Sequence, residues 1–223
     1  MNFLEELRRR ADALRERKTE DDTALRRHVS QVESACKATL AYFMSLMEHL
    51  NVLHPASKAR FQLDRKHAFD GLHLTDFYVD SRRKRWRKDE VFDLLVLHWQ
   101  LKSGQKMVMS KDFLPEIQQL EDRLRQGGVT MDAETVRNPQ NGKLQEMRYS
   151  FVADFRGSVR IVPQHDAGLL QFHLQNLDGL EAVAFDLPAE DVDGHRLDEL
   201  ARWLVGEPHD FLKGAHNLRR IEA

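Results

Sequence analysis

The first fifty residues show a helical pattern of apolar positions and contain no strong helix breaker. The first proline is Pro55, and all 11 glycines lie at Gly71 or later. Apolar or small side chains recur at intervals of three and four residues, which places them on one side of a helix. This apolar stripe consists of Leu4, Leu7, Ala11, Leu14, Leu25, Val29, Val32, Cys36, Leu40, Phe43, Met47 and Leu50. We therefore predict a helical arm over residues 1–54.

The arm has one weak point. Lys18 and Asp21 occupy stripe positions where apolar residues are expected, so the segment Arg15–Thr23 is either a polar interruption or a break where the helix folds back. About 48 residues of continuous helix would extend roughly 70 Å, which is longer than a domain of this size can cover. The stripe should therefore pair with another helix, either in a coiled coil between chains or in an intrachain helical hairpin.

The coiled-coil hypothesis predicts a homo-oligomer, such as a homodimer, or docking on a helical protein partner. It assigns the interface to eight residues of the stripe. These are Leu25, Val29, Val32, Cys36, Leu40, Phe43, Met47 and Leu50.

After Pro55 the apolar period changes from helical to alternating, which indicates β-strands. Dipeptides such as Asn141-Gly142 and Asp178-Gly179 are typical of hairpins, and short connections between successive strands make a sheet antiparallel. Residues 55–223 thus form a second domain, and the chain belongs to the α+β class, with a mainly antiparallel sheet and two helices. The strands are expected at 72–78, 91–101, 106–109, 129–136, 144–156, 158–163, 169–175 and 181–187, and the helices at 112–126, capped by Asp112, and 193–204.

Composition narrows the class of protein. Hydrophobic residues make up 41% of the chain and charged residues 31%, values that support a core with a well-solvated surface. A single cysteine, Cys36, excludes an intramolecular disulfide framework and suits a reducing compartment. The N-terminus does not resemble a signal peptide, and nowhere do 18 apolar residues run together. The sequence therefore predicts a cytoplasmic protein without a membrane partner.

The densest charge feature is a basic run within a positive zone. The net charge is −2, yet residues 51–102 carry 11 basic and 7 acidic side chains. The run comprises Arg82, Arg83, Lys84, Arg85, Trp86, Arg87 and Lys88 and should lie on or beside a hairpin. Basic side chains beside an aromatic ring suit nucleic-acid binding. The alternative is a solvated turn that meets the protein's own acids, and Asp89 and Glu90 follow directly.

Candidate pocket residues come from the alternating strands. Such a sheet has one buried and one wet face, and a pocket between its layers would be lined by His98, Gln100, His173 and Gln175. His49 and His54 are five residues apart, outside the spacing that would place two imidazoles on one metal. We expect no catalytic residue, no metal and no cofactor.

Three functions follow from these observations, in this order. The first is a non-enzymatic interaction or assembly protein that self-associates or docks through its N-terminal helix and presents an α+β binding domain. The second is a nucleic-acid-binding protein that uses the basic run. The third is a small-molecule-binding or enzymatic α+β domain with a pocket between sheet and helices.

Overall fold

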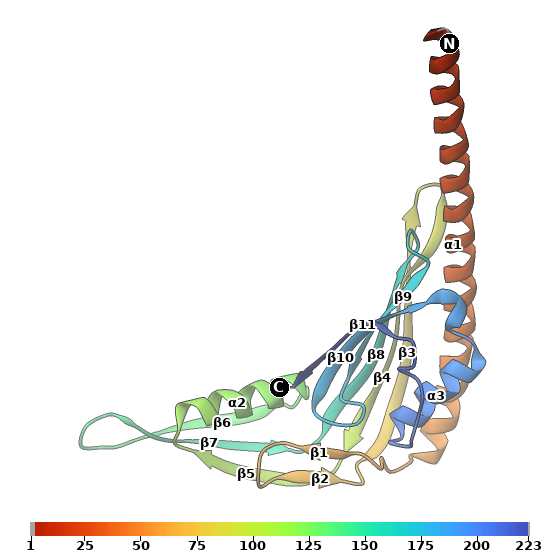
Figure 1. Ribbon diagram of the computed structural model, residues 1–223. Helices are drawn as coiled ribbons and strands as arrows, with labels where there is room; N and C mark the ends of the chain where they lie inside the picture. The colour runs from red at the N-terminus through yellow and green to blue at the C-terminus, as the bar shows by residue number, and fades with distance from the viewer. Residues whose placement is uncertain (1–2, 223) are drawn as a thin grey trace.

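The N-terminal arm is one unbroken helix. The computed structural model describes residues 3–222, and α1 extends over Phe3–Leu53 without a break. At 1.5 Å per residue its 51 residues span about 76 Å. The hydroxyl groups of Thr19 and Thr23 donate to the carbonyl oxygens of Arg15 and Thr19, one turn earlier, so this segment is a continuous polar stretch. The intrachain helical hairpin is wrong (Figure 1).

The centre of the molecule is a six-stranded antiparallel sheet with the strand order β11-β10-β9-β8-β4-β3. Its strands are β3 (His73–Trp86), β4 (Asp89–Lys102), β8 (Phe155–Gln164), β9 (Leu169–Gln175), β10 (Glu181–Pro188) and β11 (His216–Glu222). The pair β3–β4 has 14 residues in each strand and extends upward beside α1 (Figure 1). The predicted α+β class with antiparallel sheets is confirmed.

A smaller layer projects sideways from the lower end of this sheet (Figure 1). We call it the wing. It consists of β5 (Lys106–Lys111), α2 (Leu114–Gln126), β6 (Met131–Arg137) and β7 (Leu144–Val152), with the strand order β5-β7-β6. The strand expected at 144–156 is thus divided at Ala153 and Asp154, because its two parts join different sheets. A two-stranded hairpin, β1 (Arg60–Gln62) and β2 (Ala68–Asp70), lies beside the wing.

Two helices cover one face of the six-stranded sheet. These are the second half of α1 and α3 (Gly194–Leu204), and the short helix η1 (Ala189–Asp191) contacts α1 as well. Val32 and Phe43 of α1 are fully buried, and Leu200 and Trp203 of α3 are each only 1% exposed. Asp193 caps α3, because its side chain accepts a hydrogen bond from the amide of Arg196.

An irregularity in β3 explains how α1 is held on the sheet. The register of β3 against β4 shifts between Thr75 and Tyr78, where Asp76 has a φ of 55°. Such a bulge leaves backbone groups without their ladder partners. The Asn51 amide satisfies both groups of Phe77: it donates to the carbonyl oxygen at 3.0 Å and accepts from the amide nitrogen at 2.8 Å.

Several local predictions failed for identifiable reasons. Three strands, β1, β2 and β11, were not predicted. The strands β1 and β2 have only three residues each, too few to show a period, and β11 is a polar edge strand. The expected cap Asp112 does not cap α2: the N-cap is Phe113, which makes no side-chain cap hydrogen bond. Phe113 is exposed, whereas Ile117, Leu120 and Leu124 of α2 are buried.

Candidate functional site

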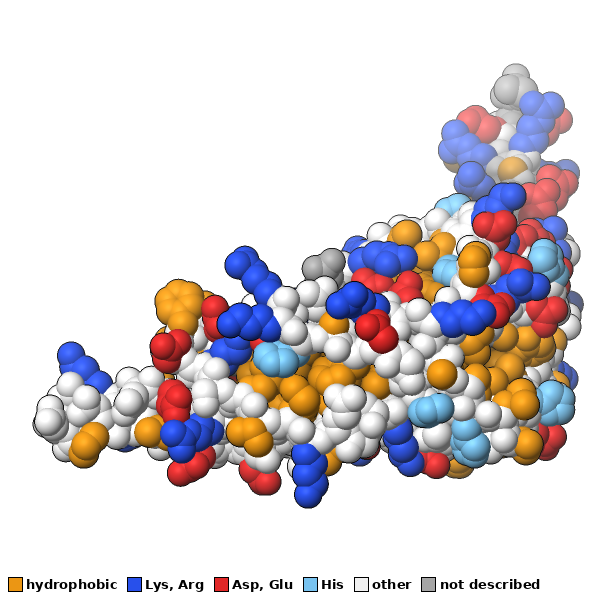
Figure 2. Space-filling view, turned by 90° about the horizontal axis from the view of Figure 1, so that it is seen from below, with side chains coloured by type: hydrophobic (Ala, Val, Ile, Leu, Met, Phe, Trp, Pro, Cys, Tyr) orange, Lys and Arg blue, Asp and Glu red, His pale blue; other side chains and the backbone are white. Residues whose placement is uncertain are grey.

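Residues 3–24 of α1 extend beyond the rest of the protein, and we call them the free half. The side chains described there are exposed except that of Ala11, which is partly buried. Leu7 is 45% and Leu14 is 67% exposed, so the apolar stripe is uncovered here. Charged side chains of both signs crowd this end of the helix (Figure 2). Two ion pairs, Arg10–Glu6 and Arg15–Asp12, lie within it.

The C-terminal part of the stripe packs on the protein's own sheet. Val32, Cys36, Phe43 and Leu50 are buried in the core. Leu40 and Met47 pack against that core, and Leu25 and Val29 are partly buried. The expected oligomer interface must therefore be corrected: the four core residues have no surface to offer a partner, because the protein's own sheet, η1 and α3 already pack against α1. Only the free half leaves the stripe open.

The basic run lies on the end of β3 and in the turn that follows it. Arg82 and Lys84 both pair with Asp93, at 2.6 and 2.9 Å. Arg83 pairs with Glu33 of α1 at 3.3 Å, and its guanidinium lies 4.5 Å from the ring centroid of Phe92. Three of the cations are therefore engaged inside the protein.

The remaining cations of the run form the hairpin tip, which we define as Arg85–Lys88. Trp86 is partly buried and stacks on His165 with 5.8 Å between ring centroids, and Arg87 lies 4.6 Å from its ring centroid. The indole is thus covered on two sides. Arg87 has a φ of 55°, a left-handed conformation that costs a non-glycine residue about 1 kcal/mol. Within residues 3–222, Arg85 and Lys88 make no ion pair.

The four candidate pocket residues lie on the uncovered face of the six-stranded sheet, opposite α1 and α3. We call this the open face. His98 and His173 are exposed, and Gln100 and Gln175 are partly buried. The register brings them close together: His98 and Gln175 both pair with Ser158, and His173 pairs with Arg160. The expected pocket between sheet and helices is corrected, because these side chains point away from both covering helices.

Both histidines of the open face are partly desolvated by the surrounding sheet, and this lowers the pKa of each. Asp80 offsets part of the effect at His98, and Arg156 adds to it. Arg160 adds to the effect at His173, and Asp186 offsets part of it. The neutral form of each imidazole is therefore favoured.

A groove of about 1180 Å³ lies where the β1–β2 turn, α2 and the β9–β10 turn meet. Its floor contains Leu63, Leu120 and Leu180, which are buried, and its walls carry charges of both signs. Sequence reasoning missed this site, because it is assembled from residues as far apart in the sequence as Arg60 and Arg220 and no local motif marks it. The charged groups are Arg60, Asp64, Arg65, Lys66, Lys111, Glu116, Arg123, Asp178, Glu181 and Arg220.

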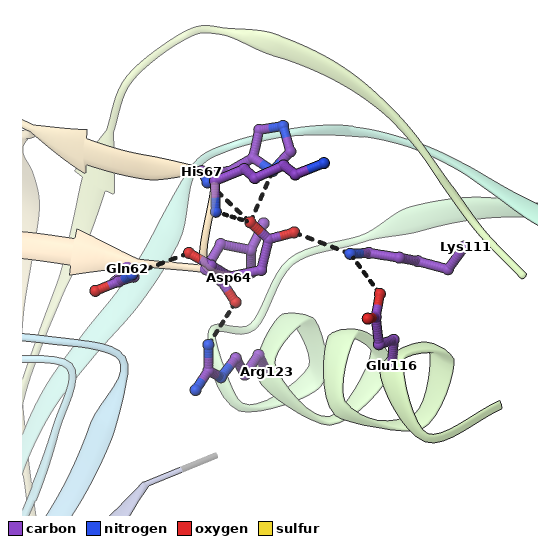
Figure 3. A network of polar contacts seen from close by, with 8 residues as sticks. Gln62, Asp64, His67, Lys111, Glu116 and Arg123 are labelled. Carbon is purple, nitrogen blue, oxygen red and sulfur yellow. Dashed lines mark hydrogen bonds and ion pairs between the residues drawn. The ribbon is translucent and has the colours of Figure 1, made fainter. Parts of the chain in front are cut away.

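Several polar contacts at the groove converge on Asp64 (Figure 3). One carboxylate oxygen accepts from the amides of Lys66 and His67 and from Nδ1 of His67, all at 2.8 Å. The other oxygen lies 3.2 Å from Nζ of Lys111, which also pairs with Glu116 at 3.1 Å. Arg123 donates to the carbonyl oxygen of Leu63 at 2.6 Å. These contacts join the β1–β2 turn to the wing, so we interpret them as a structural latch.

The latch shifts the pKa of both charged groups at its centre. Burial alone would raise the pKa of Asp64, but the amides of Lys66 and His67 and the side chains of His67 and Lys111 hold it at about 2. Burial alone would lower the pKa of Lys111, but Glu116 and Asp64 raise it above its ordinary value.

Asp64→Asn should destabilise the protein by about 1–2 kcal/mol at pH 7, because hydrogen bonds to a charged acceptor are lost. The folded pKa lies below the unfolded value of about 3.9, so the contribution is present above pH 4 and disappears as the pH falls towards 2. Urea unfolding of both proteins at pH 7, 4, 3 and 2 would measure this difference.

A matched control is Asp70→Asn. The Asp70 side chain is 69% exposed, and its carboxylate makes a long ion pair, 3.9 Å, with Arg60. Such a surface pair contributes little, so this variant should follow the wild type at every pH. A difference between Asp64→Asn and the wild type that stays constant down to pH 2 would contradict the assigned role of the carboxylate.

The described residues contain neither a metal site nor a helix that could span a membrane. Among the described residues, no three His, Cys, Asp or Glu side chains lie close enough to hold a metal ion. None of the described helices combines the length and apolar character needed to cross a membrane. Comparison of the chain with protein-family models, curated protein sequences and solved structures found no match.

Proposed function

We propose that this protein is a cytoplasmic, non-enzymatic assembly protein that associates through the free half of α1, with a second copy of the chain as the first partner to test. The observation that carries the proposal is an apolar stripe that the protein's own sheet covers only from Leu25 onward. The α+β body would then be presented at one end of a rod.

The energetics of the free half support a partner. Helices in proteins are stabilised mainly by tertiary packing, and the free half has none. Its two ion pairs are exposed, and each contributes only a few tenths of a kcal/mol. A partner that covered Leu7 and Leu14 would add about 2 kcal/mol per chain, judged from their exposed fractions. This is a modest gain, so the association should be reversible and depend on protein concentration.

Replacing Leu7 and Leu14 together with glutamate should abolish self-association, because two carboxylates would enter the contact. Light scattering coupled to gel filtration would be carried out at protein concentrations from about 10 μM to about 200 μM. The mass should rise above the 26.1 kDa of one chain for the wild type only. Met44→Glu is the matched control, since Met44 is 51% exposed on the same helix but outside the free half. A wild-type mass of one chain at every concentration, with the arm helical by circular dichroism, would rule out self-association.

Nucleic-acid binding through the basic run remains the second proposal, with fewer of its cations available for phosphate contacts. Arg82, Arg83 and Lys84 are engaged by acids of the protein, so Arg85 and Lys88 would have to supply the phosphate contacts. Trp86 is already engaged by His165 and Arg87, which would compete with a base for its ring.

A further inference from the structure

The open face carries two arginines that have no acidic partner. Arg156 and Arg160 lie on β8, four residues apart, and both are exposed. Within residues 3–222 neither forms an ion pair, although cations on the neighbouring strands do: Arg82 and Lys84 pair with Asp93, and Lys102 pairs with Asp76. An unpaired arginine fork is well suited to bind phosphate or carboxylate oxygens.

A band of polar side chains, two of which carry rings, crosses the sheet between these arginines. Tyr78 pairs with His98, His98 pairs with Ser158, and Ser158 pairs with Gln175, so the four side chains follow one another across β3, β4, β8 and β9. Arg156 and Arg160 each lie two residues from Ser158 along β8, one on either side of the band. The ring of Tyr78 is 60% exposed, and His173 lies beside Arg160.

The lower end of the open face is bounded by the wing. Gln175 donates to the carbonyl oxygen of Gln126 at the end of α2. The aliphatic part of Arg156 packs so close to Gly128 that a Cβ there would lie 2.9 Å from its Cδ. Arg156 is therefore held in position at its stem while its guanidinium is exposed. Two acids lie near the histidines of this face, Asp80 on β3 near His98 and Asp186 on β10 near His173, and Asp186 accepts a hydrogen bond from Asn217.

The spacing of the two arginines selects the kind of ligand. Four residues of a strand at about 3.3 Å each place their Cα atoms roughly 13 Å apart, too far for one phosphate to bridge. An extended polyanion can contact both, and exposed rings between the contacts suit unstacked bases. Single strands can lay their unstacked bases on such an exposed sheet surface. We propose that the open face binds single-stranded nucleic acid, with Arg156 and Arg160 on phosphates and Tyr78 and His98 against bases.

The test is fluorescence anisotropy of labelled homopolymers of deoxythymidine and of uridine, titrated with the full chain at several salt concentrations. Arg156→Gln with Arg160→Gln should weaken binding at least tenfold at low salt. It should also reduce the slope of log K against log salt by about 1.4, the value for two phosphate contacts on a single strand. Tyr78→Ala should weaken binding at least about fivefold without changing that slope. Binding of only one polymer would identify RNA or DNA as the ligand.

Two matched controls separate this inference from the other proposals. Arg85→Gln with Lys88→Gln removes the same number of cations from the hairpin tip and should leave the affinity within about twofold, as a removed charge that contacts no phosphate would. The double glutamate variant at Leu7 and Leu14 should bind as the wild type does, because it alters only self-association. Loss of binding in the tip variant with retention in the Arg156 and Arg160 variant would overturn the inference. So would the absence of binding at low salt, or equal binding of polyglutamate with no effect of Tyr78→Ala, which would indicate an acidic polypeptide.

Discussion

Gly157→Ala should destabilise the protein by about 3 kcal/mol, the upper end of what overpacking normally costs. A Cβ at this position would lie 2.1 Å from Cε2 and 2.3 Å from Cζ2 of Trp99, its partner across β4 and β8. Trp99 is 1% exposed and stacks on Phe77, so the indole has no free space to enter. Urea unfolding followed by circular dichroism would measure the loss.

Gly179→Ala is the matched control for this substitution. Its added Cβ would meet nothing closer than 4.0 Å, and its φ is not positive, so the change should stay within about 0.5 kcal/mol. Replacing Trp99 with leucine should cost less in the Gly157→Ala background than in the wild type, because the clash disappears with the indole. Equal costs in the two backgrounds would show that the two residues do not compete for the same space.

Glu33→Ala is expected to destabilise the protein by a similar amount, about 3 kcal/mol, because three groups lose one shared partner. One oxygen of Glu33 accepts from the amide of Phe92 at 2.8 Å and lies 3.0 Å from Nε2 of His165, and the other pairs with Arg83. The His165 side chain is only 2% exposed, so water cannot replace the carboxylate. Thermal and urea unfolding would both report the loss.

Glu48→Ala provides the control, since this acid is exposed on the same helix and should change stability by no more than about 0.5 kcal/mol. Glu33→Gln separates charge from hydrogen bonding: it keeps an acceptor for Phe92 but removes the ion pair with Arg83, so its loss should be intermediate. If Glu33→Ala unfolded at the same temperature and urea concentration as the wild type, this carboxylate would not anchor α1 to the β3–β4 and β8–β9 hairpins.

Local patterns accounted for most of the secondary structure. The stripe from Leu7 to Leu50 predicted α1, and the alternation around Phe172 and Leu174 predicted β9, because the periods of helices and strands are properties of neighbouring residues. Hairpin dipeptides such as Asn141-Gly142 predicted the antiparallel pairing of β6 with β7. The split of residues 144–156 between two sheets could not be predicted, since a strand pattern does not say which partner it will join.

The candidate sites depended much more on tertiary contacts. The basic run was visible in the sequence, but nothing local showed that Asp93 and Glu33 would neutralise three of its cations. His98 and His173 were expected in a pocket because alternation identifies a polar face without identifying what covers it. The structure placed both beside Arg160 and Arg156 on the uncovered face, a grouping that spans about 75 residues of chain.

The sequence by itself determined a helical pattern for the first fifty residues and, in the rest of the chain, alternating strand patterns with two helical segments. It also showed no metal-ligand or catalytic motif. Those are consequences of spacing and residue type, which act over a few positions. Only the tertiary structure decided that β3 and β4 cover the stripe from Val32 onward and leave Leu7 and Leu14 exposed. The reason is physical: a side chain's period fixes the direction in which it points, but its burial depends on which distant segment packs against that side.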